Sequence, residues 1–214
     1  MRVILTGATG MVGEGVLLEC LDHADVSEVL VVGRRHYDFA HPKLKELLVK
    51  DFLQIGNYAA QLSGYDACFY CAGVSVIGKS EAEYTKITYE TTLLFAKTVL
   101  QQNHGIVFNF VTGRRTDSTE KGGAMWARVK GKTENALMNM GFMHQYNFRP
   151  GLMLPTKGQR SMKTSYRVAA AILKNFMPKS TLTLKQVGLA MIHSVTRGYP
   201  KHVLEVDDIR KLAA

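Results

Sequence analysis

Residues 3–15 read VILTGATGMVGEG, a short β-branched run followed by a glycine-rich turn and the start of a helical pattern. This order of strand, turn and helix is the context in which a three-glycine fingerprint holds the pyrophosphate of a dinucleotide. Gly7 permits the tight turn, Gly10 lets the backbone approach a phosphate, and Gly13 lets the new helix pack closely on the sheet. The N–H groups at the helix start favour an anion, so the stretch predicts nucleotide binding; an ordinary strand-to-helix turn is the alternative.

The second predicted strand, residues 28–32, is followed by Gly33, Arg34 and Arg35. The residue that meets the adenosine ribose lies about twenty positions past the glycine turn, which is this region. An acidic residue there would suit the free 2′-hydroxyl of NAD, whereas two guanidinium groups suit a 2′-phosphate. We therefore predict that NADP(H) is preferred over NAD(H), with a solvated surface arginine pair as the alternative.

The rest of the chain alternates strand and helix patterns over 214 residues, of which 46% are hydrophobic. The expected strands lie near residues 2–6, 28–32, 47–50, 66–72, 105–111 and 144–149, with a short strand near 202–206. The expected helices lie near residues 11–22, 57–62, 81–102, 124–140, 165–176 and 185–196, with a last helical turn from Asp207. This alternation predicts an α/β fold, a doubly wound parallel sheet with helices on both faces. We expect one domain over residues 1–214, with about 150–214 contributing a small substrate lobe.

The cysteines and histidines do not form a recognisable metal or disulfide pattern. Cys20, Cys68 and Cys71 are odd in number, and Cys68 and Cys71 are three apart in a predicted strand, where they point to opposite faces. The seven histidines lack ligand spacing, so no metal is expected. No leader pattern and no apolar run of about 18 residues is present, which predicts a cytoplasmic protein without a membrane partner.

The net charge of +9 is concentrated in segments expected to follow the strands at their carboxyl ends. These cations are Arg34, Arg35, Arg114, Arg115, Lys121, Arg128, Lys130, Lys132, Lys157, Arg160, Lys163 and Arg167. Open α/β sheets bind ligands at that edge, so the pattern favours an anionic cofactor and an anionic small-molecule substrate. No nucleic-acid reading motif is present, and no nucleic acid is expected. A solvated basic face is the alternative for about half of these residues.

With these motifs in view, the chain resembles the short-chain dehydrogenase/reductase superfamily nearly end to end, in its extended and atypical branches. Thr6 to Gly13 match its TGxxGxxG turn, and residues 129–134 match the VKGxxE stretch of the small Tat-interacting tumour-suppressor branch, close to the NmrA-like branch. The resemblance implies that Asp51 and Phe52 contact adenine, that the turn of residues 71–73 touches the adenosine ribose and the nicotinamide side, and that residues 149–151 border the nicotinamide. The implied cofactor site comprises Gly7, Thr9, Gly10, Met11, Val12, Gly13, Arg34, Arg35, Asp51, Phe52, Cys71, Ala72, Gly73, Lys130, Pro150 and Gly151.

The sequence departs from the family at the catalytic YxxxK pair. Lys130 matches the lysine and Thr112 matches the family serine, but Trp126 stands where the tyrosine belongs. An indole N–H donates a hydrogen bond but does not release its proton near neutral pH, so it cannot act as a general acid. Tyr84 and Tyr89, in the predicted helix 81–102, are the alternative proton donors.

Two functions remain open from the sequence. The first is an oxidoreductase or epimerase-like enzyme that acts on a carbonyl or hydroxyl substrate and uses another group in place of the family tyrosine as its general acid. Lys130 and Thr112 favour this function. The second is a non-catalytic module that senses NADP(H) and binds a protein partner, and Trp126 favours it.

Overall fold

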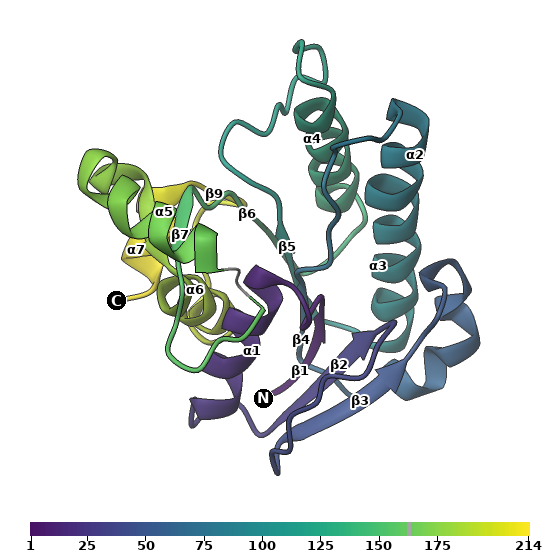
Figure 1. The fold of residues 1–214 in the computed structure, drawn as a ribbon. Helices are drawn as coiled ribbons and strands as arrows, with labels where there is room; N and C mark the ends of the chain where they lie inside the picture. Colours follow the sequence, from purple (N-terminus) through teal and green to yellow (C-terminus); the bar gives the residue numbers. More distant parts are fainter. Residues whose placement is uncertain (162–163) are drawn as a thin grey trace.

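Seven parallel strands form the main sheet of the computed structural model, which describes residues 1–161 and 164–214 (Figure 1). Their order is β3-β2-β1-β4-β5-β6-β9, and each neighbouring pair is parallel. Their bounds are β1 (Arg2–Thr6), β2 (Glu28–Gly33), β3 (Leu44–Leu48), β4 (Ala67–Tyr70), β5 (Val107–Val111), β6 (His144–Phe148) and β9 (Val203–Leu204). This arrangement confirms the predicted doubly wound α/β fold.

Helices cover both faces of the sheet because its inner strands are apolar on both sides. Val3 and Leu5 join one core cluster, whereas Ile4 between them joins the other. The first cluster lies under α1 (Met11–Asp22), α6 (Leu184–Thr196) and α7 (Val206–Leu212). The second lies under η1 (Phe52–Leu62), α3 (Thr91–Gln102) and α4 (Met125–Met138). A short helix α2 (Glu81–Thr85) runs through the π-helical η2 (Lys86–Glu90) into α3.

Several predicted boundaries are corrected by the structure. The strand expected near 47–50 spans Leu44–Leu48, because at this sheet edge a polar face is tolerated: Lys45 Nζ lies 2.5 Å from Glu28 Oε2. The helix expected near 57–62 is a 3₁₀ helix that already begins at Phe52, where Asp51 caps it. The strand expected to reach residue 72 ends at Tyr70, so residues 71–73 form a turn.

The C-terminal part of the chain forms a second, two-stranded sheet and also contributes to the main sheet. The strands β7 (Leu152–Leu154) and β8 (Thr181–Thr183) form a separate parallel pair. In the sequence, α5 (Thr164–Phe176) and η3 (Pro178–Ser180) lie between them. In contrast, α6, β9 and α7 complete the main sheet and its core. Small residues let α6 approach α1, since a Cβ on Gly15 would lie 2.7 Å from the Cβ of Leu184 and one on Gly188 would lie 2.8 Å from that of Glu19.

The cysteines occupy the two faces as the strand pattern predicts. Cys68 belongs to one core cluster, while Cys71 packs against the other, which contains Cys20. All three thiols are free, and burial raises the pKa of Cys71 to about 12. Among the described residues, no helix is long and apolar enough to cross a bilayer, and no three metal-binding side chains gather in one place.

Candidate functional site

A main cleft of about 460 Å³ opens at the carboxyl ends of β1, β2, β4 and β5. It lies where the strand order reverses beside β1, the position at which doubly wound sheets bind their ligands. The hydroxyl oxygen of Thr6 accepts the Ala72 N–H at 3.0 Å and joins the turns after β1 and β4. The lining includes the predicted site residues Gly7, Thr9, Gly10, Arg34, Arg35, Asp51, Phe52, Cys71, Ala72, Gly73 and Lys130.

Close contacts within the protein require glycine at two positions of the turn, Gly7 and Gly13, whereas Gly10 has more room. Gly7 has a φ of +77°, and a Cβ on it would lie 2.7 Å from the carbonyl oxygen of Cys71. A Cβ on Gly13 would lie 2.1 Å from the carbonyl oxygen of Gly7, so α1 packs directly on the turn. Gly10 is the N-cap of α1 and lines the cleft, and its Cβ would meet one backbone oxygen at 3.3 Å. Without a side-chain cap, the first N–H groups of α1 remain suited to a pyrophosphate.

Charged and aromatic groups lie at the other end of the main cleft. Arg34 and Arg35 are exposed, and within residues 1–161 and 164–214 neither guanidinium forms a hydrogen bond or an ion pair. Asp51 accepts the Leu53 N–H at 3.0 Å, and the Phe52 ring stacks on Phe95 with 5.5 Å between centroids. These contacts hold both residues at the cleft edge, and the residue set fits a dinucleotide.

Some predicted cofactor residues lie outside the main cleft. Met11, Val12 and Gly13 belong to the first turn of α1, and the Met11 carbonyl oxygen accepts from Gln159 Nε2 at 2.5 Å. Pro150 and Gly151 line a second pocket of about 490 Å³, because the chain turns away after β6 towards β7. This second pocket is lined by Thr112, Gly113, Arg114, Arg115, Pro150, Gly151, Leu152, Met153, Met177 and Ser180.

Lys130 connects the two cavities. It lines the main cleft, and its Nζ donates to the carbonyl oxygen of Thr112 at 2.9 Å. Burial lowers the pKa of Lys130 to about 8, although the nearby negative charge of Glu134 acts in the other direction and raises this pKa. The Thr112 hydroxyl donates its only proton to Glu134 Oε1 at 2.6 Å, so that proton is turned into the protein interior.

A buried ion pair that the sequence patterns did not predict joins α4 to the residue after β6. Glu134 on α4 is fully buried and accepts from Arg149 Nε at 3.1 Å, while an Nη of the same guanidinium bonds its other oxygen. Burial lowers the pKa of Arg149, but its hydrogen bonds with Glu134 outweigh this, so the net pKa is raised. Arg149 also donates to the Ser118 hydroxyl at 2.6 Å, which joins the end of β6 to the loop before α4. A glutamate on the apolar face of a predicted helix was the signal available in the sequence.

We expect Arg149→Leu to lower the free energy of unfolding by about 3–5 kcal/mol, because it leaves a buried carboxylate without its cation. Urea denaturation measures this loss. The double variant Glu134→Gln, Arg149→Leu should recover part of it, since the remaining amide is neutral. Equal stability of Arg149→Leu and the wild type would show that the pair contributes nothing.

Aromatic residues near Lys130 occupy different positions. Trp126 is half-buried in the first turn of α4 and is absent from the lining of both cavities described above. Tyr84 on α2 is buried, lines the main cleft together with Lys130, and has its pKa raised by burial. Tyr89 lies outside the cleft lining, and its ring contacts Lys132 Nζ at 4.7 Å.

The π-helical turn η2, between α2 and α3, contributes side chains to the main cleft. The sequence pattern predicts one regular helix over 81–102, but the structure inserts η2 between α2 and α3. A π turn shifts which side chains share a face. Lys86, Ile87 and Thr88 from this turn line the main cleft.

A second buried carboxylate fastens the C-terminal lobe to α1. Glu14 accepts the N–H groups of Arg160 and Ser161, at 3.0 Å and 2.6 Å, and the Tyr37 hydroxyl at 3.1 Å. Burial raises the pKa of Glu14, but these hydrogen bonds outweigh it and the net pKa is lowered. The carboxylate therefore holds the loop after β7 against the helix that carries the glycine turn.

The family model described as the NAD dependent epimerase/dehydratase family matches residues 3–112, and the chain belongs to this family. This confirms the resemblance to short-chain dehydrogenases/reductases. The chain is 28% identical to Protein HTATIP2 of Rattus norvegicus over 156 residues, which cover 71% of this chain and 62% of that protein. It is 26% identical over 189 residues to Protein fmp52-1, mitochondrial, of Aspergillus terreus, covering 86% of this chain and 78% of the relative.

A solved structure shows the same fold. It is the Bordetella bronchiseptica enzyme WbmF in complex with NAD+, with a TM-score of 0.66 and 16% identity. The match covers 99% of this chain and 76% of that one. The fold of a nicotinamide-dependent family is thus established for the chain.

Proposed function

We propose that the protein is an NADP(H)-dependent oxidoreductase that acts on a small anionic carbonyl or hydroxyl compound. The observation that carries this proposal is the convergence of the glycine turn, Arg34, Arg35, Lys130 and Tyr84 on one cleft. Membership of an NAD-dependent family supports it. A nicotinamide would supply hydride transfer there.

The residues around the main cleft suit successive parts of the cofactor. The N-terminus of α1 at Gly10 would hold the pyrophosphate, and Arg34 with Arg35 would hold the 2′-phosphate. Phe52 would border the adenine, and the Lys130 ammonium would hold the nicotinamide ribose. Tyr84 would give its proton to the substrate oxygen, which is the role left vacant by Trp126.

The second pocket supports an anionic substrate. Arg114 Nη1 donates to the Ser180 hydroxyl at 2.5 Å, and no carboxylate among the described residues pairs with Arg114 or Arg115. The backbone of Arg115 has a φ of +71°, a conformation that residues other than glycine rarely adopt. Two guanidinium groups without carboxylates suit a carboxylate or phosphate group of the substrate.

A non-catalytic NADP(H) sensor that binds a protein partner is the second candidate. The inward-turned Thr112 proton and the position of Trp126 favour it. Steady oxidation of NADPH with anionic aldehydes and ketones would support the enzyme. Tight NADPH binding with no turnover of any of them would support the sensor.

A cytoplasmic location is part of the proposal, and the three free thiols support it. The expected partner is a small molecule. No nucleic-acid role is proposed, because the cations that line the two cavities suit small anions.

The cofactor preference gives a direct prediction. NADPH should bind at least about tenfold tighter than NADH, a difference of about 1.4 kcal/mol, because only NADPH carries the 2′-phosphate. Calorimetric titration measures both affinities. The Arg34→Ala, Arg35→Ala variant should lose the preference, whereas Arg197→Ala, at an exposed arginine beyond α6, should keep it. A double variant that still prefers NADPH would refute the assignment.

Cofactor affinity should also depend on pH through Lys130. Its pKa of about 8 means that the ammonium is charged at pH 7 and loses its proton as the pH rises through 8. An anionic cofactor favours the charged form, so NADPH affinity should fall about three- to tenfold between pH 7 and 9. The 2′-phosphate is already mostly ionised at pH 7, so its own titration changes the affinity little in that range. Lys130→Gln should bind more weakly at pH 7 with a flat profile, and an unchanged slope in this variant would exclude Lys130 as the cause.

A further inference from the structure

Helix α5 presents an uncovered apolar face. Val168, Ile172 and Phe176 follow one another at one-turn spacing, and their exposed fractions are 56%, 56% and 79%. Leu173 and Met177 lie beside this stripe and are 43% and 44% exposed. Side chains four apart form a continuous surface along a helix, and a large exposed apolar surface marks an interaction site. We call these five residues the α5 stripe.

The helix is held to the protein at few points. Among its described side chains only Ala170 is fully buried, and β7 is the element that α5 contacts most. Figure 1 shows α5 at the outer edge of the molecule, beside β7 and on the side away from α3 and α4. Val168, Ile172 and Phe176 therefore face outwards and are mostly uncovered, whereas Leu173 and Met177 are partly covered and Met177 also lines the second pocket.

The sequence that contains α5 is basic. Residues 135–204 contain no aspartate or glutamate. Their cations are Arg149, Lys157, Arg160, Lys163, Arg167, Lys174, Lys179, Lys185, Arg197 and Lys201. Lys174 on α5 and Lys179 shortly after it are exposed, so the apolar stripe is combined with lysines at the C-terminal end of the helix.

We propose that α5 docks on an anionic lipid surface. An interfacial helix lays its apolar side chains at the boundary between headgroups and acyl chains, and its lysines contact the anionic headgroups. A second copy of the chain is a poorer occupant, because two α5 helices face to face would bring their lysines together. Nucleic acid is also poorer, because the centre of the face is apolar. With lipid as the occupant, the helix lies in the plane of the lipid surface. This inference goes beyond the proposed oxidoreductase function.

Vesicle sedimentation tests the proposal. The wild-type protein should sediment with phosphatidylcholine vesicles containing about one third phosphatidylserine, and at least about tenfold less with phosphatidylcholine alone. Binding to the anionic vesicles should weaken as salt is raised, because salt screens the lysines. Phe176→Glu and Ile172→Glu should each reduce binding at least about tenfold, because a carboxylate would enter the apolar boundary.

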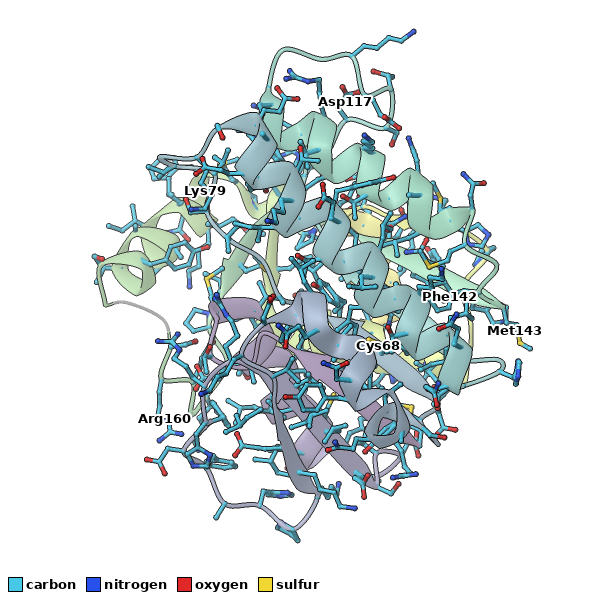
Figure 2. The ribbon with its side chains drawn as sticks, turned by 90° about the vertical axis from the view of Figure 1, so that its right-hand side faces the viewer. Cys68, Lys79, Asp117, Phe142, Met143 and Arg160 are labelled. Carbon is cyan, nitrogen blue, oxygen red and sulfur yellow. The ribbon has the colours of Figure 1, made fainter. Side chains whose placement is uncertain are left out.

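A matched control separates the α5 stripe from a general effect of charge. Met143 is 67% exposed and lies on the opposite side of the molecule from Arg160, as Figure 2 shows. Met143→Glu makes the same change in charge and should bind vesicles as the wild type does. Thermal unfolding confirms that the three variants fold, since the substituted side chains are exposed.

The contrary results are specific. No sedimentation of the wild type with anionic vesicles at low salt would overturn the proposal. Binding of Phe176→Glu equal to that of the wild type would also overturn it, because lipid binding would then depend on cations outside the α5 stripe. Self-association in ultracentrifugation that Phe176→Glu abolishes, without vesicle binding, would assign the α5 stripe to a second copy.

Discussion

Gly10→Val is expected to lower the affinity for NADPH at least about a hundredfold, or about 2.7 kcal/mol, while the protein stays folded. The added side chain enters the cleft where the backbone must approach the pyrophosphate. Within the protein its Cβ would make one tight contact, 3.3 Å from the Gly7 carbonyl oxygen, which a shift of a few tenths of an ångström relieves, and the backbone is extended at φ −103°. Calorimetry measures the affinity, and thermal unfolding measures the stability.

Gly13 is the matched control for Gly10. A Cβ at Gly13 would lie 2.1 Å from the Gly7 carbonyl oxygen, so Gly13→Ala should destabilise the fold itself. Gly10→Ala should fall between the wild type and Gly10→Val in NADPH affinity. Wild-type affinity in a folded Gly10→Val variant would mean that the turn has a structural role only.

Tyr84→Phe is expected to lower the turnover number about 10² to 10⁴-fold, because it removes the proposed proton donor. NADPH affinity should stay unchanged, since the ring is retained in the cleft wall. Stopped assays of NADPH oxidation with an anionic carbonyl substrate give the turnover number. Separate titrations give the affinity.

Two other aromatic positions serve as controls for Tyr84. Tyr89→Phe should leave turnover unchanged, because Tyr89 lies outside the cleft lining. Trp126→Tyr should give little gain, since Trp126 lines neither of the two cavities. Full activity in Tyr84→Phe, together with a large gain in Trp126→Tyr, would place the proton path on α4 instead.

The strand and helix alternation and the glycine turn could be predicted from the sequence because they depend on local patterns. The apolar residues of β1 alternate between the two faces, and Gly7 and Gly13 have steric roles that one sequence segment defines. The same locality explains the placement of Arg34 and Arg35, which follow β2 directly.

The remaining features depend on contacts between distant segments. Glu134 and Arg149 neutralise each other across the end of β6, and Glu14 binds a loop that lies far along the chain. The pair β7 and β8 has three residues in each strand, too few for a periodic signal. These long-range contacts also direct Pro150 and Gly151 to the second pocket rather than to the main cleft.

The loop before α4 shows the same limit of local reasoning. Asp117 accepts the Gly122 N–H at 2.6 Å and the Thr119 hydroxyl at 2.6 Å, and a Cβ on Gly131 would lie 1.8 Å from its carbonyl oxygen. Figure 2 shows Asp117 in the loop above the helices. Local turn chemistry forms this loop, but only its contact with α4 fixes where it lies.

The main cleft is proposed to bind NADP(H) with its 2′-phosphate on the arginine pair. A crystal structure of the protein with NADP+ tests this proposal most directly. We expect the 2′-phosphate within hydrogen-bonding distance of Arg34 and Arg35, the pyrophosphate at Gly10, and the nicotinamide ribose beside Lys130. A cofactor bound elsewhere, or an empty cleft at saturating NADP+, would contradict the account.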